Sequence, residues 1–269
     1  MKKFIALLTV LVVVFTAAGA APAKADTVQG SEILTNYKVV GYPDIQIYKS
    51  NVKIYIEGKL VDFEKMYNRP VISIKGRIML PARAFVYYIN NVPPGADDKF
   101  SAHYWPNKPF ATDWEKARRT DGRTGANWIM LIHKVPNTNK EIHVNLLEGY
   151  QYVTEYFQEA GNPYSGRDDY KTFKMDIPPL ITDIAGGTTY LPLRIQAYLF
   201  GFGVKFDEAN NAVYISKDIP MEFGNGIEEV KNEPQYQDEW IGEYGIFYPD
   251  YGYLYQNGKN IEIYPWDGK

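Results

Sequence analysis

A nine-residue segment occurs twice in this chain, and the duplication limits what the chain can fold into more than any other feature. Residues 75–83 read KGRIMLPAR, and residues 186–194 read GGTTYLPLR. One glycine, the leucine, the proline and the arginine match at a single offset of 111 residues. Self-similarity at one fixed offset indicates a repeated supersecondary unit. We therefore expect two related units in the middle of the chain.

Each copy has the residue types of a turn, a short strand and a helix, in that order. Gly76 and Gly187 lie in polar surroundings between extended runs, where a turn with positive φ favours glycine. Pro81 and Pro192 suit the first turn of a helix, because the φ of proline is already helical and its missing N–H costs nothing there. A helix is therefore predicted directly after each short strand.

Apolar residues at helical spacing follow both prolines. In the first copy they occupy positions 82, 85, 86 and 89, which share one face of a helix. The second copy has a weaker stripe, because Gln196 interrupts it, and Gly201 is expected to end that helix as a left-handed cap. Alternating or β-branched runs predict strands over the following ranges: 52–56, 128–133, 141–146, 204–206 and 212–216.

The economical packing for such units is an antiparallel sheet around each helix. We therefore predict an α+β fold made of tandem units of twisted antiparallel sheet, each packed on one short helix, with a C-terminal β-hairpin in addition. The hairpin is expected over residues 251–264, where Gln256-Asn257-Gly258-Lys259 has the composition of a type I′ turn.

Together these motifs resemble the copper amine oxidase-like N-terminal domain, also called the stalk domain, of secreted and cell-surface proteins of Gram-positive-type bacteria. The pattern G-R-x-M-L-P-x-R after an E-G-K-L hairpin, and Y-L-P-L-R followed by G-x-G-V-x-F-D and A-V-Y-I, supports the resemblance over residues 44–217. It implies a twisted antiparallel sheet wrapped around a helix, usually as a tandem of such units.

The chain departs from this family pattern in three places. The first helix ends in Val86-Tyr87-Tyr88-Ile89-Asn90-Asn91 instead of a Glu-Ala-Leu-Gly-like sequence, and Thr188 of the second copy stands where the first has Arg77. A polar insertion over residues 92–127 contains Pro-Pro-Gly and Asp-Gly turn signals, and we expect it on the surface.

The family name does not imply copper chemistry for this chain. In copper amine oxidases the quinone-forming tyrosine and three histidine ligands belong to a different, larger domain. Here there are 0 Cys and 3 His, at positions 103, 133 and 143, and no His-x-His. His133 and His143 could form a weak two-ligand site across a hairpin, although ordinary sheet histidines are the favoured interpretation. No catalytic residue, metal or cofactor is predicted.

Arg83 and Arg194 occupy the same place in the two copies. Two roles are open to them. They could grip a ligand, or each could pair with a carboxylate or with strand carbonyls to fix its helix against the sheet. The resemblance favours the second, structural interpretation.

The N-terminus predicts secretion. Residues 1–25 have the basic start, short apolar core and Ala-Lys-Ala ending of a signal peptide, and residues 26–43 form a lead-in to the tandem region. Removing residues 1–25 leaves 26 basic and 32 acidic residues, a net charge of −6 without a basic stripe, which disfavours nucleic acid as a partner. No later apolar stretch is long enough to span a membrane.

Aromatic residues crowd into the C-terminal extension, residues 218–269, with ten of them between positions 236 and 266. Exposed Tyr and Trp rings can stack on sugars, but they can equally pack as core or contact another protein. The candidate binding residues are Trp240, Tyr251, Tyr253, Tyr255, Tyr264 and Trp266.

These observations favour a secreted, non-catalytic protein that serves as a structural or binding module of the cell envelope. Its expected partners are cell-wall polysaccharide or another envelope protein. The alternative is an extracellular hydrolase acting on cell-wall or other polysaccharide, with paired carboxylates from residues 92–127 or 160–185 in a cleft.

Overall fold

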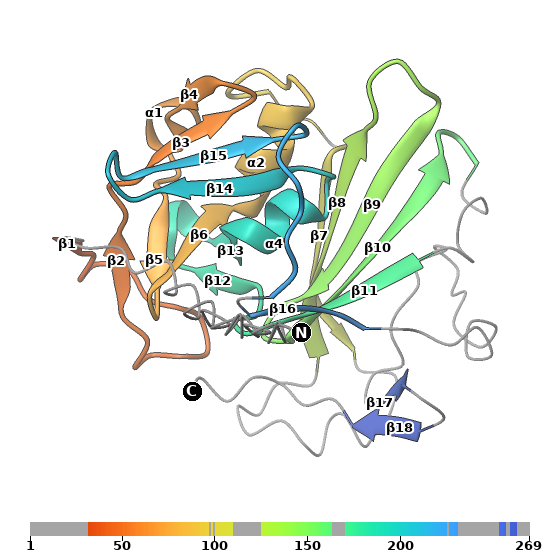
Figure 1. The fold of residues 1–269 in the computed structure, drawn as a ribbon. Helices are drawn as coiled ribbons and strands as arrows, with labels where there is room; N and C mark the ends of the chain where they lie inside the picture. Colours follow the sequence, from red (N-terminus) through yellow and green to blue (C-terminus); the bar gives the residue numbers. More distant parts are fainter. Residues whose placement is uncertain are drawn as a thin grey trace, which may run out of the picture.

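The computed structural model describes residues 32–96, 98, 100–109, 125–162, 170–224, 226–230, 253–256 and 259–262. Within them the fold is mostly β, with three sheets, a two-stranded hairpin and three short α-helices (Figure 1). This composition is compatible with the predicted α+β class. The expected signal peptide, residues 1–25, lies outside the described residues, among which no helix is long and apolar enough to cross a membrane.

The first sheet contains the strands of both nine-residue motifs. It is antiparallel throughout, because every pair of neighbours in it runs in opposite directions. Its order is β1 (Glu32–Ile33), β2 (Ile47–Lys49), β5 (Ile72–Ile74), β6 (Arg77–Pro81), β13 (Thr188–Pro192) and β12 (Leu180–Thr182).

The second sheet joins strands that precede the first motif copy to strands that follow the second. Its order is β14 (Gly203–Asp207), β15 (Ala212–Ser216), β3 (Lys53–Ile56) and β4 (Lys59–Val61). Strands β15 and β3 run parallel, with Val213 opposite Ile54 and Ile215 opposite Ile56. All four of these side chains are buried, which supplies the hydrophobic reason for the pairing.

The third sheet is antiparallel and stands beside the helices (Figure 1). Its order is β16 (Ile227–Val230), β11 (Tyr170–Met175), β10 (Tyr152–Glu159), β9 (Lys140–Leu147), β8 (Gly125–Lys134) and β7 (Ala102–Pro109). Strand β7 lies inside the polar insertion that was expected to be a surface loop. It belongs to the sheet because Ala102 pairs with Leu131 and the indole of Trp105 stacks on that of Trp128 at 4.0 Å.

The two motif strands pair directly with each other. In the β6–β13 ladder Leu80 lies opposite Leu191, its equivalent in the other copy. Helices α2 (Ala82–Ile89) and α4 (Leu193–Tyr198) follow these strands, and the ring of Phe85 in α2 lies 6.1 Å from that of Phe200, which follows α4. Both helices therefore belong to one sheet system and one core.

Local features follow the residue types. Gly76, Gly187 and Gly201 have φ of 78°, 120° and 77°, the positive values predicted for them. Pro81 and Pro192 are the N-cap residues of α2 and α4, one position before the first turn in which they were expected.

Asn90 joins the end of α2 to the third sheet. Its amide nitrogen donates to the hydroxyl of Ser101 at 2.7 Å and to the carbonyl of Ile132 at 2.8 Å. Its amide oxygen accepts from the Nδ1–H of His133 at 2.7 Å and from the backbone N–H of Lys134 at 3.2 Å. One carboxamide thus uses both its donor and its acceptor capacity to hold helix and sheet together.

We expect Asn90→Ala to lower the free energy of unfolding by roughly 2–4 kcal/mol, because the substitution strands several buried polar groups. Urea denaturation measures the change. The matched control is Asn210→Ala, whose amide bonds only the exposed Asp207 carboxylate at 2.8 Å and which should cost less than about 1 kcal/mol. Equal losses for the two variants would contradict the role of Asn90.

His133 is held in its neutral form. Burial, with a smaller contribution from the positive charge of Lys217, lowers the pKa of His133 to about 4. Its Nδ1–H is committed to Asn90, and its buried Nε2 has no hydrogen-bond partner among the described residues, so a proton added there would be unsatisfied.

Stability should therefore fall as the pH falls from about 6.5 to about 4, because the unfolded chain binds a proton at this histidine in that window and the folded chain does not. His133→Asn retains a donor in the place of Nδ1 but cannot titrate. Thermal unfolding of both proteins at several pH values should show a shallower slope for the variant, and identical slopes would refute the assignment.

Candidate functional site

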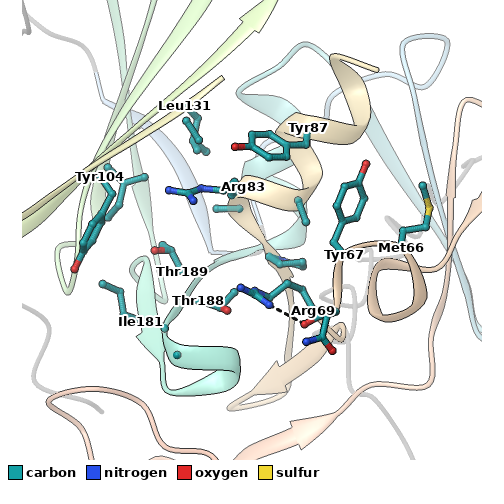
Figure 2. Close-up of a pocket in the computed structure, with 18 of the residues that line it drawn as sticks. Met66, Tyr67, Arg69, Arg83, Tyr87, Tyr104, Leu131, Ile181, Thr188 and Thr189 are labelled. Carbon is teal, nitrogen blue, oxygen red and sulfur yellow. Dashed lines mark hydrogen bonds between the residues drawn. The ribbon is translucent and has the colours of Figure 1, made fainter. Parts of the chain in front are cut away.

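A cavity of about 840 Å³ opens between helices α1 (Phe63–Tyr67) and α2, strands β7 and β8 of the third sheet, and the β12–β13 segment (Figure 2). It therefore lies at the N-terminal end of the first motif helix. The third sheet contributes its helix-facing side, including Tyr104, Ile129 and Leu131. The second copy contributes Ile181 and residues 186–189. The volume of the cavity is within the roughly 300–1,000 Å³ usual for ligand pockets.

Arg83 enters the cavity because of its place on α2. Ala82, Phe85 and Val86 face the core and are buried, so position 83 falls on the opposite, exposed side of the helix. Among the described residues the Arg83 guanidinium makes no hydrogen bond and no ion pair; its charge acts electrostatically on His103. Figure 2 shows the guanidinium extending from the helix toward the side of Tyr104.

Arg69 reaches the same cavity from the segment after α1. That helix ends at Asn68, which takes the left-handed conformation with φ of 53° and turns the chain. Arg69 follows, half-buried, and donates from Nη1 to the carbonyl of Asn68 at 2.9 Å. Lys65, on the exposed side of α1, supplies a third cation to the lining.

Tyrosines form much of the wall. The hydroxyl of Tyr87 donates to the carbonyl of Asp98 at 2.8 Å, and that of Tyr67 donates to the carbonyl of Val92 at 3.4 Å. These bonds orient both rings along the cavity. Burial raises the pKa of Tyr67, so it stays protonated and acts as a neutral donor. Tyr104 is 43% exposed on the opposite wall.

No aspartate or glutamate belongs to the described lining, although the chain holds 32 acidic residues against 29 basic ones. The neighbouring carboxylate, Asp98, accepts hydrogen bonds from Ser101 and from the backbone N–H of Phe100. Burial alone would raise the pKa of Asp98, but these bonds outweigh it and hold the pKa below its usual value. The cavity is therefore cationic and aromatic.

The equivalent position in the second copy is closed. Arg194 lines a space of only about 30 Å³, shared with Arg77, Asp176 and apolar side chains of the second sheet. Arg194 is half-buried and engaged within the protein, and the Nε of Arg77 donates to the Asp176 carboxylate at 2.6 Å. The two motif arginines therefore have different surroundings.

Of the motif residues singled out from the sequence, Pro81, Arg83 and Gly187 line the cavity, Pro192 and Arg194 line the small space, and Gly76 lies in the β5–β6 turn. The other cations and the tyrosines of the lining could not be recognised as site residues from the sequence, because they come from segments far apart in the chain with no shared pattern.

The histidines do not form a pair. His133 lies opposite Ile142, and His143 lies opposite Ile132. Since side chains alternate across a strand, the two imidazoles project from opposite faces of the sheet, and the two-ligand arrangement considered above is wrong. His143 instead contacts Glu141 at 3.1 Å, and no group of three or more potential metal ligands occurs within the described part of the chain.

The predicted C-terminal hairpin is present, with β17 (Tyr253–Gln256) antiparallel to β18 (Lys259–Glu262). The backbones of Tyr253 and Tyr255 lie in β17. Their side chains, and all of Trp240, Tyr251, Tyr264 and Trp266, lie outside the described residues.

Comparison of the chain with protein-family models, with curated proteins and with solved structures found no match. The cavity is therefore interpreted from its own residues.

The charge of Arg83 can be detected at His103. Burial lowers the pKa of His103, and repulsion from Arg83 lowers it further, against opposing effects of Phe100 and Asp98. Arg83→Gln should raise the pKa of His103, whereas Lys53→Gln, which removes the charge of an exposed side chain on β3, should not. NMR titration of the imidazole C–H signals measures both, and an unchanged His103 in the Arg83 variant would contradict this arrangement.

Proposed function

We propose that this protein is a secreted, non-catalytic binding module of the cell envelope, of the stalk-domain type, and that the cavity beside Arg83 is its ligand site. The observation that supports this most directly is the difference between the two motif copies. One arginine is engaged in a nearly filled space, while its equivalent faces about 840 Å³ without a bonded partner among the described residues.

The stalk-domain organisation that we propose is two related units interlocked through the β6–β13 pair. Support comes from the pairing of equivalent residues, Leu80 with Leu191, and from the bond that the side-chain nitrogen of Gln196 donates to the carbonyl of Ala82 at 3.1 Å. The second unit thereby supplies one wall of the cavity at the first.

A cell-wall polysaccharide suits the chemistry of this cavity. Aromatic rings can pack against the apolar CH faces of sugars, and Tyr67, Tyr87 and Tyr104 contribute such surfaces. Asn68, Thr188 and Thr189 add polar groups at the same cavity for sugar hydroxyls. Glycoside hydrolysis needs two carboxyl groups about 5–9.5 Å apart, and the described lining of this cavity offers none, so this cavity suits binding. Many of the acids that the hydrolase alternative invokes, in residues 110–124 and 163–169, lie outside the described residues.

Blocking the cavity tests the proposal. Ala96 is exposed at the cavity, so Ala96→Trp should obstruct it without changing the core. We expect the full-length secreted protein to be retained on insoluble bacterial cell walls, and the variant to be retained several-fold less. Ala209→Trp, at an exposed turn elsewhere, is the matched control. Equal retention of all three proteins would overturn the cavity as the site.

The aromatic extension is the competing binding region, and replacing Tyr253 and Tyr255 by Ala tests it in the same assay. Removing the whole extension by ending the chain at Asp218 would not test the extension alone, because it would also remove contacts of the core. It would remove β16, whose Ile227 is buried, and the backbone N–H of Glu222, which donates to Tyr198 at 3.0 Å.

A further inference from the structure

We infer that the cavity recognises a saccharide unit bearing an oxyanion, a carboxylate or a phosphate, gripped by Arg83 and Arg69 with its ring against the tyrosine walls. This inference rests on the proposed function, because it assigns the ligand class of the same cavity.

Neither guanidinium group at the cavity is in an ion pair with the described residues. The Arg83 guanidinium makes no hydrogen bond with them, and the Arg69 guanidinium donates among them only to the adjacent carbonyl of Asn68. A guanidinium has five N–H donors in a rigid fork that matches a planar carboxylate or a phosphate. Two such groups at one cavity therefore offer most of their donors to a ligand.

The neighbouring acids are not paired with these arginines among the described residues. Asp98 is bonded to Ser101 and Phe100, and Glu64 pairs with Lys49 at 2.7 Å. Asp62 caps α1 by accepting from the backbone N–H of Lys65 at 2.9 Å. The described lining itself holds arginines and a lysine and no carboxylate, which favours an anion over a neutral sugar.

Figure 2 shows the guanidinium groups of Arg83 and Arg69 entering the cavity from two different elements, Arg83 toward Tyr104 and Arg69 toward Thr188. Tyr87 flanks Arg83 on the same helix. An oxyanion at the Arg83 guanidinium would leave the body of its sugar beside aromatic rings, while Arg69 adds its charge to the same cavity, so charge and ring would be recognised together.

Calorimetric titration of the full-length secreted protein tests the charge of the ligand. The probes are digalacturonate for the carboxylate, glucose 6-phosphate for the phosphate, and neutral galactobiose. We expect at least one charged probe to bind roughly tenfold or more tightly than galactobiose, with affinity that falls as salt is added. The charged probe that binds identifies which oxyanion the cavity recognises. Equal affinity for all probes, or no binding of either charged probe in the millimolar range, would overturn the inference.

Variants assign the effect to the two arginines. Arg83→Gln and Arg69→Gln should each weaken the charged probe roughly tenfold or more. Lys53→Gln makes the same change in net charge at an exposed site away from the cavity and should leave the affinity unchanged. If Lys53→Gln weakens binding as much as the others, the attraction is general and the inference fails.

Failure of this inference is distinguishable from failure of the proposed function. If Ala96→Trp abolishes retention on cell walls while the Arg83→Gln and Arg69→Gln variants are retained as well as the unmodified protein, the cavity is the site but its ligand is not recognised by its charge. If Ala96→Trp has no effect, the site itself is wrong.

Discussion

The carboxamide of Asn90 holds the end of α2 against strand β8, and the shape of the molecule around the cavity depends on this connection. The helix provides Arg83 and Tyr87, while the third sheet provides Tyr104 and the apolar floor. Nothing in the local sequence joins these two walls. Apolar side chains of α2 and β8, including Phe85 and Leu131, share one core. The Asn90 side chain adds bonds to a hydroxyl, a carbonyl, an imidazole and a backbone N–H, which fix the end of the helix against the sheet.

A second connection holds the other side of the third sheet, at strand β11. Arg77 of β6 pairs with Asp176, which follows β11, and the Asp176 carboxylate also accepts from the N–H of Ile177 at 2.9 Å. Both connections use positions at which the two copies differ in sequence: Asn90 stands where the second copy has Gly201, and Arg77 stands where it has Thr188. These differences attach the third sheet to residues of the first copy.

Local structure was predictable from the sequence, and long-range pairing was not. Glycines with positive φ, prolines before helices and the apolar face of α2 follow from steric and hydrophobic rules that act within a few residues. Strand β7 escaped prediction because Pro106 and Pro109 are turn signals in its sequence, and because it forms only by pairing with β8. The cavity escaped for a related reason: its residues come from five separated segments, and only the motif residues at it carried a sequence signal.

The parallel pairing of β3 with β15 has a mechanical consequence. Strand β3 precedes the first motif copy and β15 follows the second, and in a parallel pair the start of one strand and the finish of the other lie at opposite ends of the ladder. Tension applied between these two ends would pull the strands along their length in opposite directions. All the ladder hydrogen bonds would then be loaded together in shear instead of breaking one after another, so stretching the chain between these points would meet the resistance of the whole ladder at once.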